Sequence, residues 1–258
     1  MDTEHLNHID PGVPGPEARP TIPFWSPWAV VGWGLVVAAV YVAVQIAVMV
    51  IWLAALDNGP HELHPAASAL VSGDLFAVAT LAVAAVCVPL IWAIAAVRAG
   101  AGTARALALR APRPRTLAAW LAATALLATA SDLVTVAFGR PLVPAFMADL
   151  VRATSTPVLL WPAIILAAPL LEELLMRGFV LEGLRRGSLG AAGSVIVTSA
   201  AWAGAHLQYD AYEIATIIVF GLLFGAARLR SGSLWVPIAM HVLVNLVATV
   251  ETLLVLAR

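Results

Sequence analysis

The sequence predicts an all-α membrane protein, a bundle of about seven transmembrane helices with an eighth allowed. Of its 258 residues, 62% are hydrophobic and only 11% are charged, and the mean hydropathy is +0.94. These values are too apolar for a soluble domain. Seven apolar runs also approach or exceed the roughly 20 residues that a helix needs to cross a bilayer.

The apolar runs follow a polar, proline-rich stretch at residues 1–27, which we expect to be a flexible tail rather than a cleaved signal sequence. The predicted spans are 28–56, 75–97, 117–138, 158–184, 191–207, 212–229 and 234–256. A run near 140–157 would add an eighth span if it entered the bilayer. The expected organisation is therefore a tail (1–27), a set of N-terminal transmembrane helices (28–140) and a transmembrane core (155–256).

Arginine, the only basic residue besides histidine, alternates with the spans. Arginines are frequent in the loop 98–116, at the end of the fourth span and between the last two spans, whereas the loop 57–72 has none. The positive-inside rule places arginine-rich loops in the cytoplasm. We therefore expect a multi-pass protein of the cell membrane with its N-terminus inside and its C-terminus outside. The loop 139–157, with Arg140 and Arg152, does not fit this pattern.

The net charge and the cysteine count bear on possible partners and on disulfide bonds. The formal net charge is −1, which argues against a nucleic-acid partner. Cys87 is the single cysteine, so the chain cannot form an intramolecular disulfide.

The fourth span carries three charges in an apolar run. Each charge near the centre of a membrane helix costs about 2.5–3.5 kcal/mol. Glu173 and Arg177 are four residues apart, so they share a helix face and can pair. Glu172 is rotated by about 100° from Glu173 and has no partner on its own helix. Pro169 can kink the helix beside it. Either Glu172 faces a functional cavity, or the charges form a structural cluster between helices.

Two later spans add polar residues at helical spacing. Trp202 and His206 are four apart in the fifth span, and so are His241 and Asn245 in the seventh. A single intramembrane histidine is usually a packing residue. Lipid cannot satisfy this whole set, so we expect one shared, hydrated cavity that also contains Glu172.

This set of side chains suits the attack of water on an amide. A carboxylate and an imidazole can hold and deprotonate a water, and a second histidine and an amide can donate to the developing oxyanion. No G-x-S-x-G or H-E-x-x-H motif is present, so neither a serine nucleophile nor a conventional zinc helix is indicated. One glutamate and two histidines could nevertheless bind a metal.

The three motifs also resemble those of a known family. Glu172-Glu173-x-x-x-Arg177, Trp202-x-x-x-His206 and His241-x-x-x-Asn245 are similar in order and spacing to the motifs of the CAAX protease and bacteriocin-processing (Abi) family of intramembrane glutamic endopeptidases. The sequence "FGLLFGAA" from Phe220 fits a further helix of that family. The resemblance covers about residues 155–250. Where the family usually has phenylalanine, this chain has Trp202.

The resemblance implies a role for each of these residues. Glu172 and His206 would activate the catalytic water, and His241 and Asn245 would form the oxyanion site. Glu173 and Arg177 would orient the first motif, and Trp202 would form an aromatic wall. The family's eukaryotic members, the type II CAAX prenyl endopeptidases, remove a C-terminal tripeptide from prenylated proteins. Nothing in this sequence shows that its own substrate is prenylated.

The sequence therefore predicts a membrane-embedded, glutamate-dependent endopeptidase that opens toward the cytoplasm. It would act on a membrane-associated protein or peptide and need no metal or other cofactor. Two alternatives stay open at this point. One is a metal-dependent protease that uses the same residues, and the other is a non-catalytic immunity or scaffold protein.

Overall fold

The computed structural model describes residues 22–57 and 72–258, and every regular element in these ranges is helical. This confirms the predicted all-α bundle. Most of the predicted tail and most of the loop after the first span lie outside the described residues. The elements are α1 (Pro27–Asp57), α3 (Gly73–Ala99), η1 (Gly100–Gly102), α4 (Thr103–Ala106), α5 (Pro114–Ala137), α6 (Ala145–Arg152), α7 (Pro157–Pro162), η2 (Ala163–Ala167), α8 (Ala168–Glu173), η3 (Leu174–Val180), α9 (Leu181–Leu184), α10 (Gly190–Gly204), α11 (Ala211–Ser231) and α12 (Trp235–Leu256).

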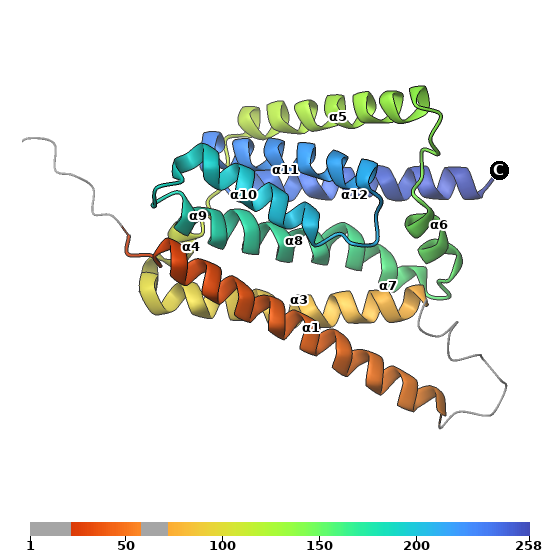
Figure 1. Ribbon diagram of the computed structural model, residues 1–258, viewed down its shortest axis with the longest axis horizontal. Coiled ribbons are helices and arrows are strands. Elements are labelled where there is room, and N and C mark those ends of the chain that lie inside the picture. The colour runs from red at the N-terminus through yellow and green to blue at the C-terminus, as the bar shows by residue number, and fades with distance from the viewer. Residues whose placement is uncertain (1–21, 58–71) are drawn as a thin grey trace, which may run out of the picture.

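Six stretches in the described part of the chain are long and apolar enough to cross a membrane, one fewer than the sequence suggested. The seventh expected span is α10, which has 15 residues and a length of about 22 Å. It therefore falls short of the roughly 30 Å of a bilayer's hydrocarbon core. The possible eighth span is the eight-residue helix α6, which lies across one end of the bundle (Figure 1).

Local sequence signals explain where several helices begin and end. The Ser72 side chain accepts hydrogen bonds from the first turn of α3. Asp210 caps α11, and Glu213 three residues later completes a reciprocal capping box. At the other end of α11, Gly232 adopts a left-handed conformation with φ of +63°, which glycine takes without steric cost.

The bundle packs in two parts around the broken fourth span. Helices α1 and α3 lie against each other and against the segment from α8 to α9, on one side of the bundle (Figure 1). Helices α10, α11 and α12 cover the opposite side of that segment, and α5 packs on α11 and α12. The fourth span is thus the central helix of the molecule. Large apolar side chains such as Leu35, Ile51 and Leu126 are exposed on the outer faces, as contact with lipid requires.

The fourth span, from α7 to α9, leaves the α-helical hydrogen-bond register twice. The segments η2 and η3, on either side of α8, are π-helical. The Ala168 N–H bonds to the Ala163 carbonyl, five residues back. The next bond in this register would join the carbonyl of Ile164 to the nitrogen of Pro169, which carries no hydrogen. Wide turns of this kind are frequent at functional sites, and here they flank the two adjacent glutamates.

Candidate active site

The predicted polar residues meet in one cavity of about 290 Å³. Side chains of α3, α5, α6, η2, α8, α10, α11 and α12 line it, together with the loops at one end of the bundle. The lining includes Glu172, Trp202, His206, His241 and Asn245, drawn from three separate parts of the sequence. The structure therefore brings these five side chains to one cavity.

Glu173 and Arg177 form the predicted ion pair. Arg177 Nη1 donates to Glu173 Oε1 at 2.8 Å, and both side chains are fully buried. Arg177 Nη2 also donates to the carbonyl of Gly221 at 3.2 Å, and the guanidinium lies 4.6 Å from the centre of the Trp202 ring. Neither residue lines the cavity. The pair neutralises one of the two glutamates and fixes the helix that carries the other.

His241 lies between the two adjacent carboxylates. Its Nδ1 is 3.1 Å from Glu173 Oε1, and its Nε2 is 4.0 Å from Glu172 Oε2. A carboxylate oxygen accepts, so Nδ1 carries a hydrogen in this contact. The ring is thereby oriented with Nε2 toward the cavity. The sequence predicted that His241 would share the cavity but not that Glu173 would hold its ring.

Trp202 contacts both residues of the predicted water-activating pair. Its indole Nε1 donates to Glu172 Oε2 at 2.5 Å. Its carbonyl oxygen lies 2.8 Å from His206 Nδ1, and the two rings meet edge to face at 5.3 Å. A carbonyl oxygen only accepts, so His206 Nδ1 donates and Nε2 keeps its lone pair in the neutral ring. Trp202 therefore does more than form an aromatic wall.

The short helix α10 explains how His206 reaches the interior. The helix ends at Gly204, so His206 lies in the turn that follows rather than on the predicted span. Because α10 is only about 22 Å long, this turn stops short of the end of the bundle. His206 is half-buried there and stacks on Tyr209, whose own burial raises the pKa of its phenol.

Asn245 fills the gap that the fourth span leaves in its backbone hydrogen bonds. Its Nδ2 donates to the Ile164 carbonyl at 2.7 Å. This is the carbonyl whose partner in the π-helical register would be Pro169. One amide hydrogen of Asn245 is used in this way, and the second remains for another acceptor.

The structure adds an acidic pair that sequence reasoning did not assemble. Asp132 on α5 and Glu251 on α12 line the same cavity, and their side chains interact with each other. In the sequence, Asp132 lies within the apolar run 117–138, and Glu251 lies near the end of the apolar run 234–256. The sequence signal for this acidic pair was one acidic residue in each of two apolar helices.

Among the described residues, no group of three or more His, Cys, Asp or Glu side chains is placed to hold a metal ion. Glu172 and His241 approach each other, whereas the hydrogen bond of His206 goes to the Trp202 carbonyl. The arrangement offers one carboxylate with partial exposure to the cavity, two imidazoles and an amide. Together these groups can bind a water and polarise an amide carbonyl.

The cavity opens at one end of the bundle. Its lining passes from Glu172 at mid-helix to Arg140, Gln208 and Glu213 in and beside the loops that precede α6 and α11. The arginine-rich loops lie at the opposite end (Figure 1). The two sequence-based expectations, arginine-rich loops in the cytoplasm and a site open to the cytoplasm, therefore cannot both hold.

A multi-span helical bundle with a polar cavity at mid-depth defines a class of membrane-embedded proteins that handle polar chemistry inside the bilayer. Comparison with known proteins identifies the family. Residues 154–247 match the family model described as "Type II CAAX prenyl endopeptidase Rce1-like". This region, which includes all three motifs, is similar to the CAAX protease family, a family of membrane proteases. The family recognised from the motifs is confirmed.

One curated relative also matches. An "Uncharacterized 24.3 kDa protein" from Escherichia coli is 36% identical over 104 residues, which make up 37% of this chain and 46% of that protein. The match thus spans about half the length of that relative. No solved structure matches the chain.

Proposed function

We propose that this protein is an intramembrane endopeptidase in which Glu172 and His206 activate a water for the hydrolysis of a peptide bond. The observation that carries the proposal is the contrast between the two adjacent glutamates. Glu173 is fully buried and neutralised by Arg177, whereas the Glu172 side chain is 29% exposed, lines the cavity and has no basic side chain of Lys or Arg paired with it among the described residues.

The proposed reaction needs only water as a second reactant. Glu172 accepts a proton from the bound water, assisted by the free Nε2 of His206. The water oxygen forms a bond to the carbonyl carbon, and the carbonyl becomes an oxyanion. His241, in its doubly protonated form, donates from Nε2 to that oxyanion, and Asn245 donates its second amide hydrogen. The proton held by Glu172 then passes to the amide nitrogen as the C–N bond breaks.

The roles follow from how each group is held. Trp202 fixes Glu172 Oε2 and His206 Nδ1, so both groups of the water-activating pair are oriented by one residue. Glu173 fixes His241, and the Ile164 carbonyl fixes Asn245. Preorganised donors of this kind reduce the cost of stabilising the transition state.

The test is peptide cleavage by the purified protein in detergent. A panel of fluorogenic peptides, with and without a farnesyl group, is incubated with the wild type and with Glu172→Gln and His206→Ala, each with and without EDTA. Asp149→Asn, a substitution on the exposed surface of α6, is the matched control. We expect the Glu172→Gln rate to fall about 10²–10⁴-fold, the usual contribution of a general base, with no effect of EDTA or of the control.

Other outcomes change the conclusion in defined ways. Cleavage that EDTA abolishes and zinc restores would indicate a metal-dependent protease. Cleavage that persists in both variants would show that the reaction occurs elsewhere. If no peptide is cleaved, a Glu172→Gln strain that keeps the wild-type phenotype in cells would favour the non-catalytic alternative.

A further inference from the structure

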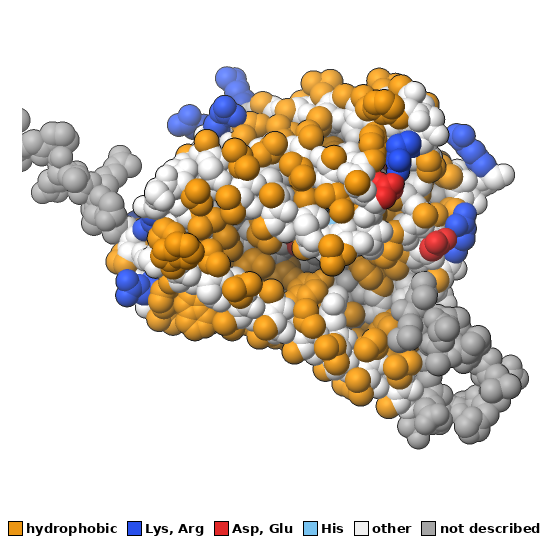
Figure 2. All heavy atoms as spheres, in the orientation of Figure 1, with side chains coloured by type: hydrophobic (Ala, Val, Ile, Leu, Met, Phe, Trp, Pro, Cys, Tyr) orange, Lys and Arg blue, Asp and Glu red, His pale blue; other side chains and the backbone are white. Residues whose placement is uncertain are grey.

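The distribution of arginine gives the bundle two different ends. Thirteen arginines lie in the described residues, and one of them, Arg177, is at the site. Nine lie at the end where α1 begins and α11 ends, namely Arg98, Arg105, Arg110, Arg113, Arg115, Arg185, Arg186, Arg228 and Arg230. Three lie at the other end, namely Arg140, Arg152 and Arg258. Figure 2 shows the basic side chains toward the two ends and a largely hydrophobic face between them.

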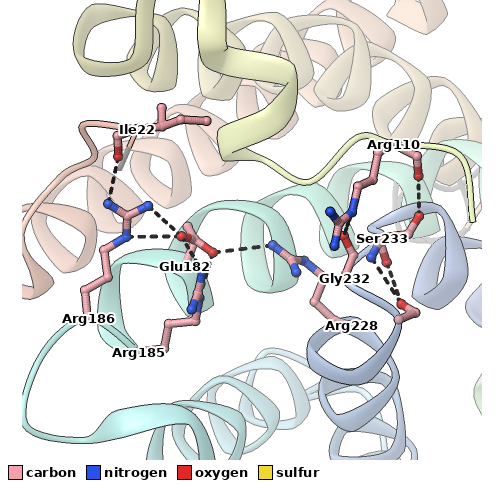
Figure 3. Close-up of polar contacts among 9 residues, drawn as sticks. Ile22, Arg110, Glu182, Arg185, Arg186, Arg228, Gly232 and Ser233 are labelled. Atoms are coloured by element: carbon pink, nitrogen blue, oxygen red, sulfur yellow. Dashed lines mark hydrogen bonds and ion pairs between the residues drawn. The ribbon is translucent and has the colours of Figure 1, made fainter. Parts of the chain in front are cut away.

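The arginine-rich end is built into the fold. Glu182, on α9, is 3% exposed and accepts hydrogen bonds from Arg185, Arg186 and Arg228 (Figure 3). Arg186 also donates to the carbonyl of Ile22, just before α1 begins. These contacts join three parts of the chain at one end. The folded bundle therefore fixes these arginines at that end.

At the opposite end, two of the three arginines are paired with aspartates. Arg140 contacts Asp210 beside the start of α11, and Arg152 Nη1 lies 3.2 Å from Asp149 within α6. These are the arginines of the loop that did not fit the alternating pattern in the sequence. The cavity mouth lies at this end, where Arg140 and Gln208 both line it.

We infer that the active-site cavity opens on the extracytoplasmic face of the membrane. The imbalance of nine arginines against three places the arginine-rich end in the cytoplasm. The cavity lining begins at the opposite end and extends inward as far as Glu172, Phe220 and His241. A substrate therefore enters from the side that faces away from the cytoplasm.

This orientation names a substrate class, which rests on the proposed function. The substrate is a polypeptide segment presented on the extracytoplasmic side, such as an exported chain or the outer end of a membrane-anchored one. A C-terminal tail exposed in the cytoplasm cannot reach the cavity mouth. Glu172 lies 15 residues from the start of α7, so the segment must extend about 20 Å inward to reach it.

Cysteine labelling in cells tests the orientation without requiring catalysis. The single native thiol, Cys87, is buried and is removed as Cys87→Ala. Gln208→Cys and Ala145→Cys then report on the mouth end, and Ser188→Cys and Ala111→Cys report on the arginine-rich end. All four positions are exposed. Spheroplasts are treated with a membrane-impermeant maleimide, and permeabilised membranes define full labelling.

We expect the two mouth positions to label in intact spheroplasts as fully as in permeabilised membranes, and the other two only after permeabilisation. The reverse pattern, or labelling at both ends, would overturn the inference. A chain that also carries Glu172→Gln should label in the same way. Loss of peptide cleavage in that variant tests the proposed function separately, so failure of one conclusion is distinguishable from failure of the other.

Discussion

Trp202→Phe isolates the contribution of a single hydrogen bond to the proposed chemistry. The indole Nε1 donates to Glu172 Oε2 at 2.5 Å, and phenylalanine keeps the aromatic ring but has no donor. A hydrogen bond to a charged group contributes about 1.5–3 kcal/mol. If the bond positions Glu172 for proton transfer, its loss should lower kcat by roughly 10- to 100-fold, because each 1.4 kcal/mol changes a rate about tenfold.

The same substitution should leave substrate binding and the fold largely intact. The introduced phenyl ring can still contact Arg177, whose guanidinium lies over the present indole. We therefore expect an unchanged KM and a small decrease in thermal stability. Trp235→Phe is the control, because Trp235 lies at the arginine-rich start of α12 and does not line the cavity.

Steady-state kinetics on a cleaved peptide from the panel would measure both parameters. A variant with wild-type kcat and a normal unfolding midpoint would refute the idea that Trp202 positions Glu172. A loss of kcat accompanied by a large loss of stability would instead assign Trp202 a structural role.

Three further predictions concern stability in detergent. Glu173→Gln leaves the buried Arg177 without its charged partner, and removal of one member of a buried pair costs about 3–5 kcal/mol; an unchanged thermal midpoint would contradict this. Gly221→Ala places a methyl carbon 2.9 Å from Ser199 Cβ, which should cost about 1–3 kcal/mol, and Ser199→Gly in the same chain should restore part of the lost midpoint. The backbone N–H of Glu213 and the side chain of Arg140 hold the pKa of Asp210 below its usual value, so Asp210 stabilises the fold above about pH 4 and loses that effect as the pH falls through its folded pKa. The midpoints of wild type and Asp210→Asn should therefore differ at neutral pH and converge in acid, and a constant difference would contradict the assignment.

Helical spacing was sufficient to predict the contacts within one helix. Glu173 and Arg177 pair because side chains four residues apart meet on a helix face whatever surrounds them. The convergence of the motifs on one cavity was also predictable, because polar groups inside a bilayer must satisfy one another or water.

Contacts between helices depend on how each helix is rotated and tilted, and spacing does not fix these quantities. The bonds of Glu173 to His241 and of Trp202 to Glu172 are of this kind. The length of α10 is another example. Its apolar run continues to Leu207, but the helix ends at Gly204. The end of the bundle at which the cavity opens depends in the same way on how the helices pack and where α10 ends.

The central position of the fourth span has a consequence for biogenesis. Its charged residues find their interhelical partners late in the chain, because Glu172 bonds to a residue 30 positions later, Arg177 to one 44 later and Glu173 to one 68 later. When this span leaves the ribosome, only the pair within it is available. Insertion of a lone charge costs about 2.5–3.5 kcal/mol. We therefore expect the span to be held in a hydrated part of the insertion machinery until α12 has been synthesised, and chains truncated before α12 to be cleared by quality control.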